Sequence, residues 1–196
     1  MTNLAVNFTP LKRSITIEPI KTKKEAKSYI QSLSHPSKMP CPSYGLPALK
    51  ACPVGKKLNK IKDAICSDCY ACKGLYQFSN VQLSQSKRLK ATYGASWISG
   101  MVRMIQDLEY FRWHDSGDLY SDEYLEKVMA VINSTPSTRH WLPTREKARI
   151  ARYLRNNDKP SNLCIRLSAT MFDSTAVKVD QCQTSGSHDK KPAIGY

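Results

Sequence analysis

Residues 110–118, which read YFRWHDSGD, are the stretch that decides the fold of this 196-residue chain. The first four residues are mostly aromatic, which predicts a short strand, and the five that follow form a polar turn. A helix is predicted from Ser121, because serine is a good N-cap and Asp122 and Glu123 place acidic groups in the first turn. The stretch therefore predicts a strand, a polar turn and a helix in succession.

The same alternation continues towards the C-terminus. Strands are predicted over residues 139–142 and 162–167, and a helix over 146–156 lies between them. Two further helices are predicted upstream, over 77–91 and 95–108, from apolar residues at helical spacing. Alternating strands and helices predict an α/β fold with parallel strands joined by right-handed crossovers. Four strand residues are expected to be structural: Trp113 and Trp141 in the core, Cys164 in the core, and His140 with its ring satisfied.

Cysteines gather in the first third of the chain, at Cys41-Pro, Cys52-Pro and Cys66-Ser-Asp-Cys69, with Cys72 close behind. Four thiolates complete the ligand shell of a structural zinc ion or of a 4Fe–4S cluster. A zinc ribbon would carry two Cys-x-x-Cys pairs, whereas this segment carries one, so the spacing favours iron–sulfur. Cys72 is an additional candidate ligand, and Cys182 is left undecided. The alternative is that these cysteines are small buried apolar residues.

The composition indicates a globular protein with a polyanionic partner. Thirty Lys and Arg against sixteen Asp and Glu give a net charge of +14, which favours nucleic acid or another polyanion. A basic surface without a defined partner is the alternative. No apolar run is long enough to cross a bilayer, and the first ten residues lack the features of a secretory signal. We therefore expect a cytoplasmic protein whose clustered cysteines serve metal binding or catalysis, with no membrane partner.

Polar residues follow each of the three predicted strands, and ligands of parallel α/β folds bind at these carboxyl ends. We interpret Asp115 and Asp118 as acceptors for a ligand, and Arg145 as a partner for a carboxylate or phosphate. The alternative is that residues 115–118 form only a turn with a helix cap. The arginines at 145, 149 and 152 share one helix face, which we expect to be a solvated face and not a phosphate-binding stripe. The candidate catalytic residues are His114, Asp115, Asp118 and Arg145, and the candidate cofactor-binding residues are Asp115, Ser116, Gly117, Asp118, Thr144, Arg145 and Ser168.

Three segments resemble the phage and plasmid "gene product 88" family: residues 66–74, residues 111–118 and residues 142–145. The similarity runs from about residue 40 to about residue 172. It implies a phage-type protein acting in the cytoplasm of a host cell, with a host protein as a further partner class.

A more distant resemblance is to radical S-adenosylmethionine enzymes, which place a three-cysteine cluster ahead of a partial (β/α) barrel. Cys66 and Cys69 match the last two cluster cysteines, and residues 115–118 match the turn that holds the cofactor's amino group. Lys62 stands where the first cysteine is needed, so Cys52 or Cys41 would substitute for it. A cluster with four cysteine ligands leaves no iron free for S-adenosylmethionine, and this argues against radical chemistry.

These observations give a single domain with four parts: a lead-in and helix over 1–34, a cysteine-rich metal-binding segment over 35–76, an α/β partial-barrel core over 77–180 and a polar tail over 181–196. We expect an iron–sulfur protein with a radical-S-adenosylmethionine-like fold that binds a small cofactor, such as S-adenosylmethionine, at the strand ends. One alternative is a non-catalytic protein that binds nucleic acid or modulates the host. The other is a zinc-stabilised protein.

Overall fold

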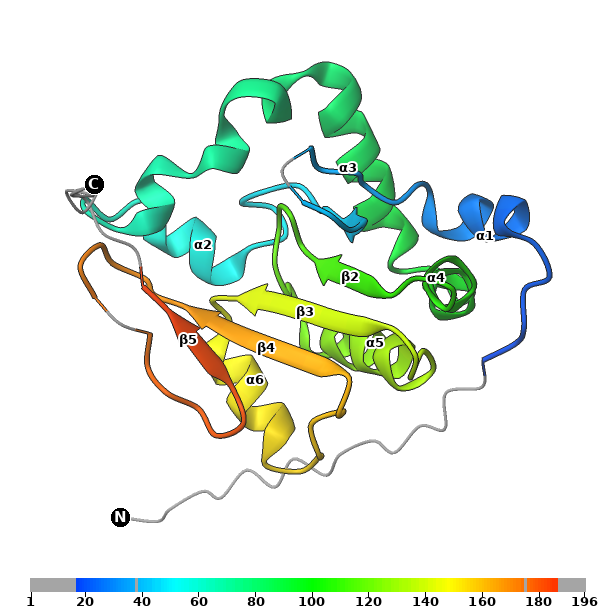
Figure 1. The fold of residues 1–196 in the computed structure, drawn as a ribbon. Helices are drawn as coiled ribbons and strands as arrows, with labels where there is room; N and C mark the ends of the chain where they lie inside the picture. The colour runs from blue at the N-terminus through cyan, green and yellow to red at the C-terminus, as the bar shows by residue number, and fades with distance from the viewer. Residues whose placement is uncertain (1–16, 38, 175, 187–196) are drawn as a thin grey trace, which may run out of the picture.

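The structure is a computed structural model, and it describes residues 17–37, 39–174 and 176–186. Figure 1 shows the course of the chain. The helices are α1 (Lys23–Ile30), α2 (Pro53–Leu58), α3 (Ser79–Ala91), α4 (Trp97–Ile105), α5 (Asp122–Asn133) and α6 (Lys147–Leu154), with short 3-10 helices η1 (Ile65–Asp68), η2 (Tyr70–Cys72) and η3 (Gly74–Gln77). The strands are β1 (Ser43–Tyr44), β2 (Tyr110–Trp113), β3 (Arg139–Thr144), β4 (Leu163–Ser168) and β5 (Gln183–Ser185).

The five strands form one parallel sheet in the order β1-β2-β3-β4-β5. The predicted α/β class and the parallel arrangement of the strands are therefore confirmed. The sheet is open, since β1 and β5 lie at opposite edges and do not pair with each other. The strands thus lie in the sheet in the order in which they occur in the sequence, as they do in a barrel, but this sheet does not close.

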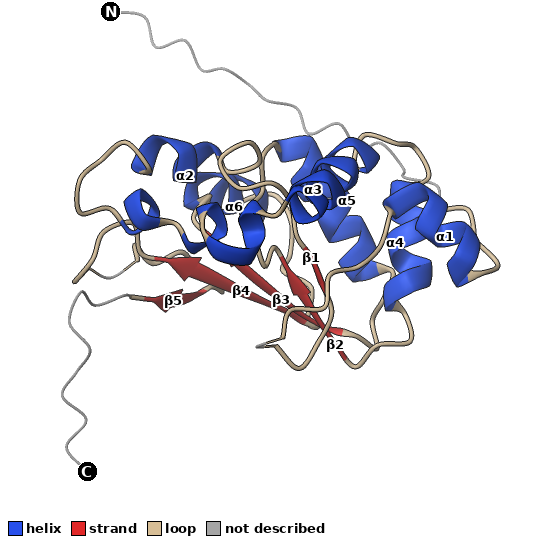
Figure 2. Cartoon of the chain, turned by 90° about the horizontal axis from the view of Figure 1, so that it is seen from above, coloured by secondary structure: helices blue, strands red, loops and turns tan. Residues whose placement is uncertain are grey.

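All the labelled helices lie on one side of the sheet (Figure 2). Strand residues at alternate positions point towards them, and Phe111, Trp113 and Leu142 are buried there in the main apolar core. The core continues between the helices through Trp97, whose indole Nε1 donates to the Tyr44 hydroxyl at 3.1 Å. Such burial of large apolar side chains is the main force that holds this layer of helices against the sheet.

The other face of the sheet carries residues that were expected in the core. Arg112 pairs with Trp141, and Trp141 pairs with Cys164, so these three side chains share one face. Trp113 lies on the opposite face from Arg112, because successive strand residues alternate. Trp141 and Cys164 are accordingly half-buried on the face without helices, and the prediction that they lie in the core is wrong.

Three short elements lie in segments where the sequence shows no periodicity. β1 and α2 lie within the cysteine-rich segment, and β5 lies in the expected polar tail, most of which falls outside the described residues. The longer elements match their expected positions to within about three residues, and Ser121 caps α5 by accepting from the Tyr124 amide at 3.0 Å. None of the helices in the described ranges combines the length and apolar character needed to cross a bilayer.

Candidate metal and ligand site at the strand ends

Cys52 and Cys66 face each other across a glycine of α2. Cys52 is the residue before the first turn of α2, and Cys66 belongs to η1. A Cβ atom added at Gly55 would lie 3.9 Å from the Cys52 Sγ and 3.7 Å from the Cys66 Sγ. An added Cβ would also lie only 2.9 Å from the Cys52 Cβ, so the absence of a side chain at Gly55 allows both cysteines to lie this close to α2.

Two more thiols continue from η1. Cys69 connects η1 to η2, and Cys72 is the last residue of η2. The Cys72 amide donates to the Cys69 carbonyl at 2.9 Å, and the nearby Cys69 thiol contributes to the raised pKa of Cys72. Cys69 interacts electrostatically with both Cys52 and Cys66, so three thiols from two segments are neighbours.

Burial sets the protonation of these thiols. Burial, together with the nearby Asp118 carboxylate, raises the pKa of Cys52 to about 12. Burial also raises the pKa of Cys66, although Arg145 opposes this rise. The pKa of Cys72 is raised by burial and by the nearby Cys69 thiol. A metal ion binds thiolates and reverses this preference, which makes proton release part of its binding.

Cys41 lies in a different environment from the other candidate ligands. Burial raises the pKa of its thiol, and the charged neighbour that opposes this is Arg112 in the middle of β2. Within the described part of the chain, no three His, Cys, Asp or Glu side chains converge closely enough to hold an ion. The structure thus places Cys52, Cys66 and Cys69 near one another, but it assembles neither these three nor the four-cysteine set that the sequence suggested into a ligand shell.

A buried carboxylate holds α2 against the end of β3. The Glu146 Oε1 accepts a hydrogen bond from the Val54 amide at 2.8 Å, in the first turn of α2. Helix N-termini have unsatisfied amides and a partial positive charge, so a carboxylate is a favourable partner. Glu146 therefore fixes Cys52 at the carboxyl edge of the sheet. It was not among the sequence candidates, although it lies two residues beyond Thr144.

Asp118, Thr144 and Arg145 meet next to these cysteines. The Thr144 hydroxyl donates to Asp118 at 2.6 Å, and the Arg145 amide donates to the other carboxylate oxygen at 2.9 Å. Burial raises the pKa of Asp118, and these hydrogen bonds oppose the rise. The Arg145 side chain reaches the next strand end, where its Nε donates to the Ala169 carbonyl at 3.0 Å. The carboxylate thus links the end of β2 to the end of β3, and the Arg145 side chain extends this link to β4. Ser168 was a candidate ligand residue, but by alternation it lies on the other face of the sheet with Cys164 and Arg166.

Asp115 performs a different task, although it is only three residues away. Its carboxylate accepts from the Ser43 hydroxyl at 2.6 Å and from the Tyr76 hydroxyl at 3.2 Å, and its backbone carbonyl accepts from the Tyr70 hydroxyl. Tyr70 and Tyr76 belong to η2 and η3, so Asp115 attaches the cysteine-bearing segment to the sheet. A side chain at Gly45 would collide with this carboxylate.

The rest of the polar turn is also engaged inside the protein. The Ser116 hydroxyl donates to the Leu46 carbonyl at 2.8 Å and accepts from the Gln85 amide at 2.8 Å. His114 is buried with a φ of 58°, and its Nε2 lies 3.2 Å from the Tyr124 hydroxyl. Its Nδ1 has no partner within the described ranges. Four of the five turn residues, His114, Asp115, Ser116 and Asp118, therefore support the architecture of the strand ends.

The two buried histidines should make stability fall in mild acid. Burial lowers the pKa of His114 to about 3 and that of His140 to about 4, from an ordinary value of 6.5. The unfolded chain then binds protons more readily than the folded one, so stability is lost as the pH falls below about 6.5, by about 2 kcal/mol for each histidine at about pH 5. Urea unfolding at a series of pH values measures this loss.

The variant His114→Asn isolates one of the two contributions, because asparagine does not titrate and tolerates the left-handed backbone. Its free energy of unfolding should depend less steeply on pH than that of the natural chain, by about 2 kcal/mol between about pH 7 and pH 5. Parallel curves for the two proteins would show that His114 is not buried in its neutral form.

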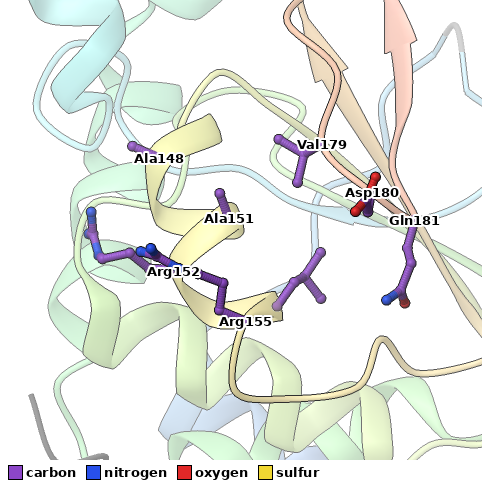
Figure 3. A pocket seen from close by; sticks show the side chains of 8 residues that line it. Ala148, Ala151, Arg152, Arg155, Val179, Asp180 and Gln181 are labelled. Carbon is purple, nitrogen blue, oxygen red and sulfur yellow. The ribbon is translucent and has the colours of Figure 1, made fainter.

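Two cavities lie near these elements. One, of about 530 Å³, separates α6 from the segment before β5, with Ala148 and Ala151 facing Val179 (Figure 3). Arg152 lines it but bonds to Asp122, which Arg149 also contacts, so both arginines form ion pairs with the first turn of α5. The other cavity, of about 520 Å³, borders η1 and the end of β4, and is lined by Lys62, Asp63, Ser67, Met171, Phe172 and Asp173.

The cavity beside η1 lies where the cysteine segment meets β4. The Ile65 amide donates to the Thr170 carbonyl at 3.0 Å, and Ala64 forms a bridge with Met171. The residue after Cys66, Ser67, lines the cavity, whose size falls within the range of small-molecule sites. The sequence signal for this region was the equal spacing of Cys66, Cys69 and Cys72, which also occurs in ferredoxin-type clusters.

Comparison with known proteins gives one match. A family model described as "Gene product 88" matches residues 11–187, which is most of the chain. No curated protein and no solved structure matches it.

Proposed function

We propose that this chain, which belongs to the gene product 88 family, holds an iron–sulfur cluster on Cys52, Cys66 and Cys69 and binds a small polar cofactor beside it. The observation that carries the proposal is that the Cys52 and Cys66 sulfur atoms both lie within contact distance of a Cβ added at Gly55. A side chain there would collide with the Cys52 Cβ, so glycine allows both cysteines to lie close to this turn of α2. Cys69 lies near both of these cysteines and contributes to the raised pKa of each. It contributes in the same way to the raised pKa of Cys72.

The chemistry of the donor set favours soft metals. Thiols are the donors at the site, and thiolates select iron–sulfur clusters and zinc over hard cations. Burial of Cys52 and Cys66 removes competing water, which strengthens the attraction between thiolates and a cation. Asp118 is already saturated by hydrogen bonds from Thr144, Arg145 and Leu119, so it serves better as a support for the site than as a ligand.

The chemistry that a cluster would supply depends on whether Cys41 is one of its ligands. A cluster held by four cysteines has no open iron, whereas one held by three leaves an iron for a further ligand. The environment of Cys41 beside Arg112 supports the three-cysteine arrangement. The small cofactor implied by the resemblance to radical enzymes is S-adenosylmethionine, and the cavity bordered by Ser67 and Phe172 is the adjacent space for it.

Metal analysis of protein purified without air tests the cluster. We expect iron and acid-labile sulfide at about four of each per chain, with the broad visible absorption of thiolate–iron bonds. One equivalent of zinc without iron would contradict the iron–sulfur proposal and favour the zinc-stabilised alternative. S-adenosylmethionine should bind the iron-loaded protein and not the chelator-stripped protein. Failure to bind with a fully assembled cluster would remove the cofactor from the proposal and leave the cluster in place.

A further inference from the structure

The face of the sheet opposite the helices has an unusual combination of side chains for a parallel sheet. Parallel sheets are normally covered on both faces, and their strands are then rich in aliphatic residues. Here no helix in the described part of the chain covers this face (Figure 2). The side chains that point to it include two aromatic residues and three arginines, which are Tyr110, Trp141, Arg112, Arg139 and Arg166.

The charge of this face has one sign. None of the residues in the five strands of the described chain is acidic, so no strand carboxylate neutralises these arginines. The Nε atoms of Arg112 and Arg166 are buried and have no hydrogen-bond partner within the described residues. The chain as a whole carries a net charge of +14. A polyanion is the partner that such a surface complements.

The aromatic residues on this face indicate which kind of polyanion it would bind. The Arg112 guanidinium lies 4.7 Å from the centre of the Trp141 ring, and that of Arg139 lies 5.9 Å from the centre of the Tyr110 ring. Tyr110 is 46% exposed. Register places these pairs on adjacent strands, since Tyr110 pairs with Arg139 and Arg112 with Trp141. Aromatic rings interleaved with arginines on a sheet face suit unstacked bases and their phosphates, whereas a duplex keeps its bases inside.

We propose that this helix-free face binds single-stranded nucleic acid, with Tyr110 and Trp141 stacking on bases and Arg112, Arg139 and Arg166 contacting phosphates. Tyr110 and Arg139 lie at the first residues of β2 and β3, far along these strands from the ends that face the cysteines, so substitutions at these two residues test the face without altering the proposed metal centre. Trp97 and Trp113 are fully buried in the core. Of the three tryptophans, Trp141 is therefore the one whose fluorescence a bound oligonucleotide should quench.

Fluorescence anisotropy with a labelled thymidine oligonucleotide of about 15 nucleotides tests the proposal, since this length covers the usual single-strand site. The natural chain should bind it more tightly than the corresponding duplex, with an affinity that falls steeply with salt. Tyr110→Leu should weaken binding by about tenfold, because loss of one base–aromatic stack has an effect of this order. Trp141→Phe should abolish the quenching of tryptophan fluorescence.

Two arginine variants provide a matched comparison, because both residues are exposed but Arg139 lies on the helix-free face of β3, whereas Arg155 is the C-cap residue of α6. Arg139→Gln should reduce the slope of log affinity against log salt by about one, whereas Arg155→Gln on the helix side should leave it unchanged. Equal slopes for the two variants would overturn the proposal. So would unchanged binding by Tyr110→Leu, or full competition by polyglutamate, which would point to an acidic protein partner. Iron content, measured on each variant, should stay at the level of the natural chain.

Discussion

Replacing Cys69 with serine is expected to reduce the iron and sulfide content of anaerobically purified protein to background. Cys69 connects η1 and η2 and interacts electrostatically with both Cys52 and Cys66. Its replacement therefore removes the one thiol that is near both of the others. A hydroxyl is a poor substitute, because iron–sulfur clusters are held by thiolates. Cys52→Ser and Cys66→Ser should give the same loss. Metal analysis and visible absorption measure the effect.

The same substitutions should also lower the thermal unfolding midpoint of the iron-loaded protein. Part of the free energy of metal binding stabilises the fold when the ligands come from separate segments, and here they come from α2 and from η1 with its continuation. Chelator-stripped natural protein is the reference, since the Cys69→Ser variant should unfold close to it.

Two cysteines serve as controls in this series. Cys164→Ser should retain full iron content, because Cys164 lies on the helix-free face of the sheet next to Gln183. Cys41→Ser decides between the two ligand sets. If the four-cysteine set suggested by the sequence holds the cluster, the Cys41→Ser variant should lose iron as Cys69→Ser does. If Cys52, Cys66 and Cys69 hold it, the iron content of Cys41→Ser should stay at the level of the natural chain. Equal loss in Cys164→Ser would show that the wrong ligands were chosen.

Replacing Gly117 with alanine is expected to cause the largest loss of stability among the glycines of the strand ends. Its φ of 79° is unfavourable for any side chain, and an added Cβ would lie 2.6 Å from the Leu46 Cβ. The neighbouring Leu46 cannot move freely, since its amide donates to the Ser116 carbonyl at 2.8 Å. Backbone strain and overpacking together should lower the free energy of unfolding by roughly 3–5 kcal/mol.

Gly74→Ala is the matched control, because Gly74 has a φ of 53° but no atom within 4 Å of an added Cβ. It should lose only the backbone contribution, about 1 kcal/mol. Urea unfolding of both variants separates the two causes. Similar losses in the two variants would mean that the contact between Gly117 and Leu46 contributes nothing.

The longer elements of this fold could be predicted from the sequence, because their apolar periodicity and caps agree with their tertiary environment. Ser121 and α5 are the clearest case. β1 and α2 could not be predicted, since each is too short to show a period. Each is stabilised by distant partners: the Arg112 amide donates to the Pro42 carbonyl at 3.1 Å, and Glu146 accepts from the Val54 amide. Trp141 was misplaced because alternation along a strand does not say which face the helices cover.

The candidate site was predicted in outline and not in detail. The grouping of Cys52, Cys66 and Cys69 near the strand ends follows from the clustering of cysteines and from the general rule for parallel sheets. The joint treatment of Asp115 and Asp118 does not hold, because the turn with its left-handed Gly117 sends their carboxylates to different partners. Sequence neighbours in a tight turn need not face the same ligand.

The attachment of Tyr70 and Tyr76 to Asp115 has a consequence for exposure of the thiols to oxidants. Tyr70 lies in sequence between Cys69 and Cys72, so its anchored ring prevents this segment from swinging away from the sheet. Cys66 is buried against a different set of side chains, which includes Leu58 and Met171. Cys69 and Cys72 belong to the anchored segment, so the rate at which an oxidant damages these two thiols should depend on the hydrogen bonds at Asp115 and thus on the local stability of the end of β2.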